Sequence, residues 1–275
     1  MNVSAPPPPL TPALAERLSG RPFVALLDID GTLAPIAPHP SKAMVPDETR
    51  RVVIELTALP DTTVVAVSGR AAADAMQILR VPGAWTIGNH GFEIAAPGEE
   101  PHPQPEAAPF ADAMSAAAAE CRAVAAGREG VLVEDKRWTV SVHYRLADAD
   151  TSMAVVSAAR KIAEQLGLRA SSGRRVIELR PPVDIDKGTA SVDLLARLGA
   201  VGREASIFAA GDDRTDEDMF RSVRSANPRA VTVRVLPDER GDVAGSEYDS
   251  VAEFNVSDPQ ELLLLLSAIV TLRQP

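Results

Sequence analysis

The sequence contains only one cysteine, Cys121, among its 275 residues. An internal disulfide requires two cysteines, so a disulfide-stapled fold is excluded and a reducing, cytoplasmic location is expected. Cys121 lies in an alanine-rich stretch and is expected to be a buried core residue. We also expect no secretory signal, because residues 1–10 contain a tetraproline and no basic start followed by an apolar segment.

Long hydrophobic runs are absent too. The longest, at 262–270, contains Ser267 and is too short to cross a bilayer. It follows Asp258 and Pro259, which suit the cap and the first turn of a helix. We therefore expect a buried C-terminal helix at this position and no association with a membrane.

Positive charge is scarce relative to negative charge: 28 lysines and arginines stand against 38 aspartates and glutamates, a formal net charge of -10. This balance disfavours nucleic acid and anionic lipid as partners, and an anionic substrate would need local positive charge. With 45% hydrophobic residues, the chain can bury a sizeable core, either as one domain with an insertion or as two domains.

The first chemical signal is the segment DIDGT at 28–32, directly after the apolar run 24–27. Such a run is typical of a strand buried on both faces of a parallel sheet, and α/β sheets build their sites where those strands end. Asp28 could attack a substrate while Asp30 handles a proton, and both could offer oxygen to Mg²⁺. Taken alone, the segment is equally compatible with an ordinary turn.

Three further polar segments occur in a fixed order along the chain. Ser68 and Arg70 follow one apolar run, Lys187 opens an amphipathic helix, and GDDRTD at 211–216 follows another apolar run. A phosphoryl group needs donors for its oxygens, a cation to offset its charge and a metal ion. Together with the first segment, these residues supply all three.

In this order the four segments resemble the motifs of the haloacid dehalogenase superfamily of phosphohydrolases. The resemblance implies an α/β fold, with a Rossmann-like parallel sheet, helices on both faces and an inserted smaller α+β cap. It also implies transfer through an aspartyl-phosphate, with Asp28 as the nucleophile and Asp30 as the acid and base. The implied catalytic residues are Asp28, Asp30, Thr32, Ser68, Arg70 and Lys187.

The same resemblance implies a Mg²⁺ site. The ligands would be a carboxylate oxygen of Asp28, the backbone carbonyl of Asp30 and the carboxylate of Asp212. Asp213 and Asp216 would lie close by, although acidic caps on the following helix are an alternative role for both. The histidines are too scattered for a zinc site by spacing.

Domain organisation follows from the alternation of strand and helix patterns in both outer parts of the chain. These patterns predict strands at 23–27, 63–67, 85–88, 206–210, 231–235 and 251–254, and helices at 46–59, 71–79 and 217–223. The middle stretch differs: it predicts helices at 107–126 and 149–166 with strands at 131–133, 138–144 and 175–180, an antiparallel arrangement. Proline-rich segments mark both its borders.

We therefore expect a tail with a short helix at 1–20, a catalytic core at 21–101 plus 183–275, and a mobile cap at 102–182. A single rigid domain with surface loops is the alternative.

Several segments narrow the resemblance further, to trehalose-6-phosphate phosphatases, over about residues 22–255. They are GNHGFE at 88–93, EDK at 134–136, HYR at 143–145, ELRP at 178–181 and GDDRTDEDMF at 211–220. The implied substrate-binding residues are His90, Glu134, Lys136, Arg145 and Glu178. Asp135 is a departure, since the family more often shows asparagine there. The alternating pattern at 138–145 also fits an ordinary solvent-exposed strand face.

The function implied is Mg²⁺-dependent hydrolysis of trehalose 6-phosphate, with a trehalose-6-phosphate synthase of the same pathway as a candidate partner. Other capped sugar phosphatases, acting on sucrose or mannosyl phosphates, share the same core chemistry. A phosphomutase would use the same nucleophile and acid/base pair, and a non-catalytic sugar-phosphate-binding domain is a third alternative, disfavoured by the intact set of acidic residues and lysine.

Overall fold

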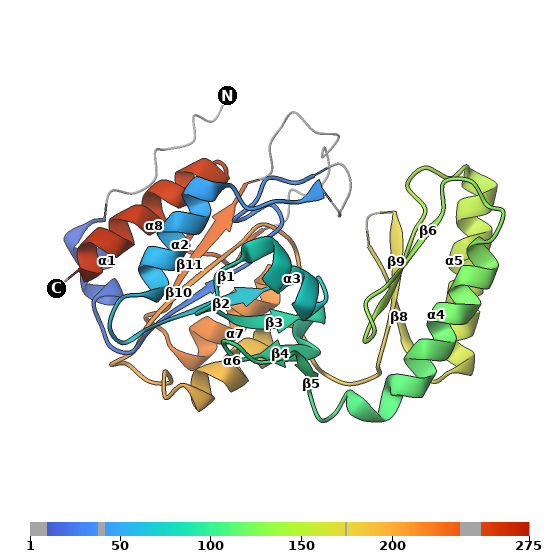
Figure 1. The fold of residues 1–275 in the computed structure, drawn as a ribbon, viewed down its shortest axis with the longest axis horizontal. Coiled ribbons are helices and arrows are strands. Elements are labelled where there is room, and N and C mark those ends of the chain that lie inside the picture. The colour runs from blue at the N-terminus through green and yellow to red at the C-terminus, as the bar shows by residue number, and fades with distance from the viewer. Residues whose placement is uncertain (1–9, 38–41, 174, 237–248, 275) are drawn as a thin grey trace. The chain divides into compact units, whose positions relative to one another are not determined.

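The computed structural model describes residues 10–37, 42–173, 175–236 and 249–274. It divides into two compact units, one formed by Met1–His102 with Ile185–Pro275 and the other by Pro103–Asp184 (Figure 1). The predicted short N-terminal helix is present as α1 (Pro12–Leu18), whereas the tetraproline lies outside the described residues.

The first unit is built on one mostly parallel sheet, in the order β12-β11-β10-β1-β2-β3-β4-β5. The strands are β1 (Phe23–Leu27), β2 (Thr62–Val67), β3 (Trp85–Gly88), β4 (Glu93–Ala95), β5 (His102–Pro103), β10 (Ser206–Gly211), β11 (Val231–Val235) and β12 (Phe254–Val256). Pairing from β12 through β3 is parallel, and β4 runs antiparallel to β3.

The centre of this sheet determines where a site can form. The chain leaves β1 to build β2 on one side and returns much later to build β10 on the other, with Leu27 in register with both Ala66 and Ala210. Ligands of open α/β sheets bind in the crevice beyond the carboxyl ends of strands at such a switch point. Residues that follow β1, β2 and β10 therefore converge.

Two hydrophobic cores hold the sheet between its helices, and β1 contributes alternate residues to each. Phe23, Ala25 and Leu27 face the core formed with α1, α2 (Asp47–Thr57), α3 (Ala72–Leu79) and α8 (Pro259–Arg273). Val24 and Leu26 face the core formed with α6 (Lys187–Arg197) and α7 (Asp216–Ala226). Helices lie on both sides of the sheet (Figure 1), and burial on both faces explains why β1 is continuously apolar.

The second unit is an antiparallel sheet in the order β6-β7-β9-β8, packed on two helices. Its elements are η3 (Ala108–Phe110), α4 (Ala111–Ala125), β6 (Leu132–Asp135), β7 (Val140–His143), α5 (Ala149–Gln165), β8 (Arg169–Ser172) and β9 (Val176–Arg180). Val140, Val142 and Ile177 point into the core with α4 and α5, which includes Cys121. The predicted core position of Cys121 is thus confirmed.

Several elements differ from the expectations. The last short strand was expected at 251–254, but β12 starts only at Phe254. Just before β12, the backbone N–H of Glu253 donates to the carbonyl of Thr232 in β11. β8 was not predicted because Arg-Ala-Ser-Ser has a weak strand pattern; its pairing with β9 creates it. β4 and β5, strands of three and two residues, were not predicted. Among the described helices, none has the length and apolarity needed to cross a membrane.

One glycine sets the spacing of the two helices that carry the acidic and basic site residues. A Cβ on Gly188, in the first turn of α6, would lie 2.3 Å from the backbone oxygen of Asp218 and 2.4 Å from Ser222 Oγ, both on α7. We expect Gly188→Ala to lower the free energy of unfolding by about 1–3 kcal/mol through overpacking. Thermal denaturation measures it, with Ala196→Ser on the exposed face of α6 as the control. Equal melting temperatures would contradict this close packing.

Candidate active site

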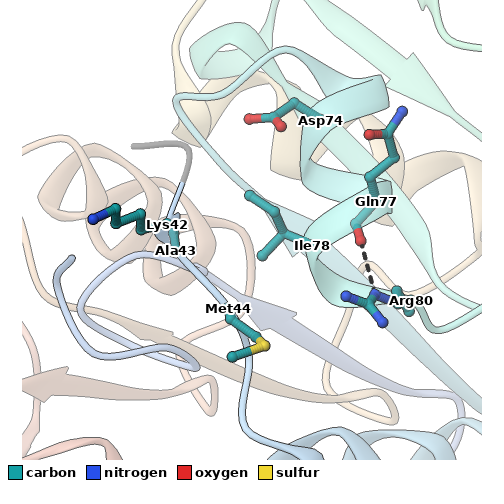
Figure 2. Close-up of a pocket in the computed structure, with 7 residues that line it drawn as sticks. All are labelled: Lys42, Ala43, Met44, Asp74, Gln77, Ile78 and Arg80. Carbon is teal, nitrogen blue, oxygen red and sulfur yellow. Dashed lines mark hydrogen bonds between the residues drawn. The ribbon is translucent and has the colours of Figure 1, made fainter. Parts of the chain in front are cut away.

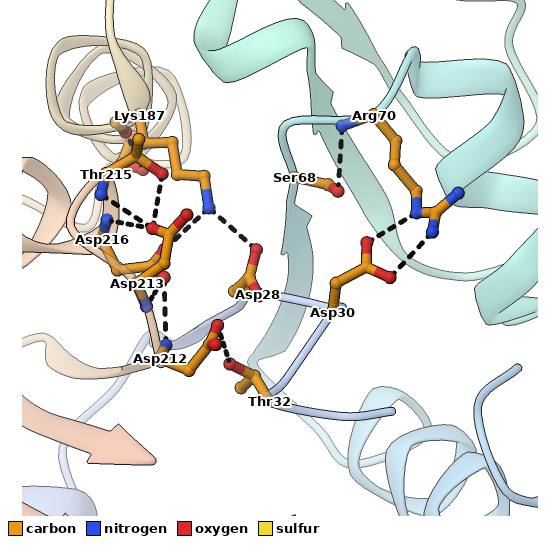
Figure 3. Close-up of polar contacts among 11 residues, drawn as sticks. Asp28, Asp30, Thr32, Ser68, Arg70, Lys187, Asp212, Asp213, Thr215 and Asp216 are labelled. Atoms are coloured by element: carbon orange, nitrogen blue, oxygen red, sulfur yellow. Dashed lines mark hydrogen bonds and ion pairs between the residues drawn. The ribbon is translucent and has the colours of Figure 1, made fainter. Parts of the chain in front are cut away.

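Acidic residues follow the two central strands and converge at the carboxyl edge of the sheet. Asp28 comes directly after β1, and its backbone N–H donates to the carbonyl of Ala210 in β10 at 3.0 Å. Asp212 comes directly after β10. Carboxylate oxygens of Asp28, Asp212 and Asp216 all lie within 4.8 Å of one another (Figure 3). These three side chains therefore converge where the topology of the sheet predicts a site.

A tight turn brings the end of β1 against Asp212. Gly31 has φ of 86°, a left-handed conformation, and a Cβ on it would lie only 2.2 Å from Asp212 Oδ2. Only glycine fits at this position, because any side chain would be strained and would displace the carboxylate. The next residue, Thr32, is fully buried, and its Oγ1 donates to Asp212 Oδ1 at 3.5 Å.

Lys187 reaches this acidic group from the start of α6. Asp186 caps the helix by accepting from the backbone N–H of Thr189 at 2.7 Å, which fixes where the helix begins. Lys187 Nζ then donates to Asp28 Oδ1 and to Asp216 Oδ1, each at 2.8 Å. The lysine side chain is only 2% exposed, so these contacts are shielded from water.

Asp216 organises the loop after β10. Its Oδ2 accepts from the backbone N–H groups of Asp212 and Asp213, each at 3.1 Å, while its Oδ1 holds Lys187. Asp213 Oδ1 accepts from the N–H of Thr215 at 2.7 Å, at the start of α7. The capping alternative therefore describes Asp213, whereas Asp216 is a buried partner of the lysine.

The electrostatics of the group call for additional positive charge. Burial raises the pKa of Asp28 to about 6 against the opposing pull of Lys187, with repulsion from Asp213 adding to the rise. Burial and the neighbouring Asp28 raise the pKa of Asp212 well above its ordinary value. Burial lowers the pKa of Lys187, but Asp216 and Asp28 outweigh it and raise that pKa well above normal.

A divalent cation fits this donor set. Four ionised carboxylates, Asp28, Asp212, Asp213 and Asp216, around one ammonium group would carry a charge of 1 − 4 = −3. Oxygen-only donors suit a hard cation such as Mg²⁺. Because both oxygens of Asp216 already accept hydrogen bonds, Asp28 and Asp212 are the better placed carboxylates for such an ion.

A second polar group lies beside the first, at the end of β2. The backbone N–H of Ser68 donates to Ile87 in β3 at 2.8 Å, and Ser68 Oγ accepts from the N–H of Arg70 at 3.2 Å. Arg70 holds the carboxylate of Asp30 through two hydrogen bonds, of 2.6 and 2.8 Å. In Figure 3 the Asp30 side chain points toward Arg70, and Asp28 points toward Lys187.

His90 contacts this second group through its backbone and its ring. It has φ of 56°, and its N–H donates to the carbonyl of Ser68 at 3.1 Å. A Cβ on Gly69 would lie 2.4 Å from His90 Cε1, so the ring packs directly on that glycine. The structure thus places His90 beside the Ser68 loop, while its binding of substrate stays a prediction.

Three of the predicted sugar-binding residues form a cluster in the second unit. Glu134, Ser141 and Glu178 are aligned across β6, β7 and β9 by the strand register. Lys136 Nζ lies 3.6 Å from Glu178 Oε1 and 4.0 Å from Glu134 Oε2. We call these residues, with the His143 described next, the Lys136 cluster.

Two neighbours support the carboxylates of the Lys136 cluster. His143 Nε2 lies 3.0 Å from Glu134 Oε2, and Ser141 Oγ donates to Glu178 Oε1 at 3.2 Å. Arg145 lies in the exposed turn after β7, and no polar contact joins it to the cluster among the described residues. Ser141 and His143 were not among the predicted site residues, although His143 stands in the quoted segment HYR. Their alternation with Val140 and Val142 places them on the face of Glu178.

Asp135, the departure from the family pattern, faces away from this cluster. Its Oδ2 accepts from Arg122 Nη2 at 2.7 Å, and its Oδ1 accepts from the backbone N–H of Arg137 at 2.9 Å. Successive strand residues point to opposite faces, so Asp135 and Glu134 are on different sides of β6. The extra negative charge is therefore offset by Arg122 and does not belong to the proposed sugar contacts.

A separate cavity of about 340 Å³ lies in the first unit between α3 and the segment that precedes α2 (Figure 2). Its lining is Lys42, Ala43, Met44, Asp74, Gln77, Ile78 and Arg80. None of the predicted site residues lines it. One lining residue, Asp74, contacts a predicted site residue, because its carboxylate accepts a hydrogen bond from Arg70 at 2.8 Å.

A family model described as Trehalose-phosphatase matches residues 26–257. The chain belongs to the trehalose-phosphatase family. Both the predicted family and the predicted α/β fold class are thereby confirmed.

Individual relatives and solved structures are similar to this chain over most of its length. A trehalose-phosphate phosphatase of Mycobacterium tuberculosis is 38% identical over 232 residues, which cover 84% of this chain and 58% of that protein. An uncharacterized glycosyl hydrolase of the same species is 35% identical over 259 residues, 93% of this chain and 19% of that protein. The crystal structure of a trehalose-6-phosphate phosphatase related protein superposes with a TM-score of 0.75 and 26% identity, over 90% of this chain and 97% of that one. The chain thus spans only part of these curated relatives.

Proposed function

We propose that this protein is a phosphatase that releases inorganic phosphate from trehalose 6-phosphate. The observation that carries the phosphatase activity is the contact of Lys187 Nζ with both Asp28 and Asp216, at 2.8 Å each, beside Asp212 at the switch point of the sheet. This arrangement presents a nucleophilic oxygen, a fixed cation and donors for phosphoryl oxygens at one place. Membership of the trehalose-phosphatase family supports the choice of sugar.

Each reacting bond can be assigned to a residue of this chain. An oxygen of Asp28 forms a bond to phosphorus as the bond from phosphorus to the sugar oxygen breaks, and Asp30 gives that oxygen its proton. A water then forms a bond to phosphorus as the bond to Asp28 breaks, and Asp30 takes the proton of the water. Lys187 favours the ionised form of Asp28 that attacks, because it opposes the rise in the pKa of that carboxyl that burial and the neighbouring carboxylates cause.

The phosphoryl oxygens need donors while charge develops on them. Thr32 and Ser68 carry hydroxyl groups just after β1 and β2, and both side chains are buried. Lys187 offsets the charge shared by the phosphoryl group and Asp28. We propose Mg²⁺ as the resident cation, held by the carboxylates of Asp28 and Asp212 and by the backbone carbonyl of Asp30. When bound, it would offset the excess negative charge of the site.

We further propose that the Lys136 cluster binds the sugar part of the substrate. A disaccharide presents many hydroxyl groups, for which carboxylates accept and ammonium groups donate hydrogen bonds. Glu134 and Glu178 with Lys136 provide both kinds of partner, and Lys136 and Glu178 are 11% and 16% exposed. Largely buried charges of this kind are better suited to bind a ligand than to solvate a surface.

We expect Glu134→Ala, Lys136→Ala and Glu178→Ala to lower kcat/KM for trehalose 6-phosphate by about ten- to a hundredfold each. Each substitution removes the partner of a sugar hydroxyl or of a charged side chain in the cluster. Leaving such a polar group unpaired costs roughly 1–3 kcal/mol. Hydrolysis of p-nitrophenyl phosphate, which has no sugar, should change by less than about twofold. Steady-state release of phosphate from both substrates measures the difference.

Two controls give this test its meaning. Asp135→Asn, on the opposite face of β6, should leave both activities close to those of the parent enzyme. The parent should also prefer trehalose 6-phosphate over sucrose 6-phosphate and mannosyl phosphates, with net release of phosphate rather than its return to the sugar. Equal losses on both substrates in all three variants, or a preference for sucrose 6-phosphate, would overturn the assignment of the sugar.

A further inference from the structure

We propose that Asp74 is a positioning residue for the reaction: it anchors Arg70, and Arg70 holds the carboxyl group of Asp30 in the orientation from which it serves the leaving oxygen. Asp30, Arg70 and Asp74 are called the Asp30 clamp below. The proposal rests on the proposed function, because it takes Asp30 as the general acid.

The contact between Arg70 and Asp30 is a two-point contact. Nε donates to Oδ2 at 2.6 Å, and Nη2 donates to Oδ1 at 2.8 Å. A planar guanidinium that engages both oxygens fixes the plane of the carboxyl group as well as its distance. Asp30 needs this restraint, because it lies in the turn after β1 with a side chain 36% exposed.

Asp74 restrains the arginine itself. Arg70 Nη1 donates to Asp74 Oδ2 at 2.8 Å, four residues along the chain. Asp74 stands in the first turn of α3, where the helix backbone fixes the place of its side chain. Arg70, by contrast, lies in the loop before the helix and carries several rotatable bonds. The carboxylate therefore ties a flexible side chain to a rigid element.

The start of α3 is braced from the other side as well. Glu93 is 5% exposed, and its Oε2 accepts from the backbone N–H of Ala72 at 2.8 Å and from Asn89 Nδ2 at 2.7 Å. The N–H of Asn89 donates to the carbonyl of Arg70 at 2.6 Å. Both the backbone of Arg70 and the helix that carries Asp74 are thus held in place. The contact with Asp74 then restrains the guanidinium from a fixed backbone position.

A purely structural role for Asp74 has a different signature. An acidic residue in the first turn of a helix, paired with an arginine four residues away, stabilises that helix slightly. Losing such a pair would lower the melting temperature and would affect all substrates alike. A misplaced general acid, however, slows reactions in proportion to how much the leaving oxygen needs a proton. The dependence on the leaving group therefore separates the two roles.

The experiment compares kcat/KM for a series of substituted phenyl phosphates, from p-nitrophenyl to unsubstituted phenyl. This parameter reports the step that releases the phenol, and the series contains no sugar, so it does not depend on the Lys136 cluster. For Asp74→Asn we expect about a tenfold loss with phenyl phosphate and less than about a twofold loss with p-nitrophenyl phosphate. Asp74→Glu, which keeps the carboxylate, should recover most of the loss.

Two further variants complete the design. Arg70→Lys keeps the positive charge but cannot contact both oxygens of Asp30 with a planar guanidinium, so it should show the same selective loss. If Asp74→Asn does not fold, Arg70→Lys still tests the proposal. Asp47→Asn is the matched control, because Asp47 lies in the first turn of α2 and pairs with Arg50 without contact to Asp30. It should keep the parental rates on the whole series.

Asp30→Asn distinguishes failure of the clamp from failure of the mechanism. If Asp30→Asn loses far more with phenyl than with p-nitrophenyl phosphate, Asp30 acts as the acid. An unchanged leaving-group dependence in Asp74→Asn and Arg70→Lys would then overturn the clamp alone, as would a gain of activity in either variant. If Asp30→Asn shows no selectivity, the general-acid role and the clamp fail together.

Discussion

Asp28→Asn is expected to abolish turnover, with a loss on the order of 10⁴-fold or more, because an amide cannot attack phosphorus as the carboxylate does. The substitution barely changes the volume of the side chain. It also removes one negative charge from a buried group in which carboxylates repel one another, so the fold should be retained. Lys187 keeps its second partner, Asp216. Phosphate release from trehalose 6-phosphate measures turnover, and thermal denaturation checks the fold.

The control for this result is Asp193→Asn, which changes an exposed aspartate of α6 and should leave the rate unaltered. A second measurement looks for the covalent step directly. Rapidly quenched parent enzyme should carry a phosphoryl group on Asp28, and Asp28→Asn should carry none. If Asp28→Asn hydrolysed the substrate at a rate near that of the parent, covalent catalysis by this residue would be ruled out.

The convergence of Asp28 and Asp212 could be predicted because it follows from two general rules, whereas the place of Lys187, which opens α6, was implied only by the family resemblance. Apolar runs with no alternation indicate strands buried on both faces, and the polar residues after such strands meet at one edge of a parallel sheet. The rules do not depend on the details of packing. These rules give no distances, however. The ion pair between Asp216 and Lys187 depends on how closely α6 and α7 approach at Gly188.

The supporting residues were harder to foresee, because nothing in their local sequence marks them. Asp74 stands four residues after Arg70, a spacing at which charged side chains can meet, but many exposed pairs share that spacing. Glu93 was part of a family-like segment, yet its role at the start of α3 depends on how that helix packs beside β4. Ser141 and His143 required the register of β7 with its neighbours, and register is set by the whole sheet.

Removal of divalent metal is expected to abolish activity, and Mg²⁺ rather than Zn²⁺ is expected to restore it. The donors gathered by β1 and β10 are all oxygens, which favour a hard, six-coordinate cation. Asp212→Ala should raise the Mg²⁺ concentration needed for half-maximal activity sharply, whereas Asp193→Ala, on the exposed face of α6, should not change it. Full activity in excess chelator would remove the metal from the mechanism.

Metal binding also has a readout that does not depend on turnover. A ligand that binds only the folded state stabilises it, by about 2.7 kcal/mol at a concentration one hundred times its Kd. Mg²⁺ should therefore raise the melting temperature of the parent protein, because it relieves the repulsion among Asp28, Asp212 and Asp216. Asp212→Ala lacks a carboxylate of this group, so its metal-free form should be at least as stable as the parent while its response to Mg²⁺ is largely lost. An equal rise in both proteins would place the bound ion elsewhere in the chain.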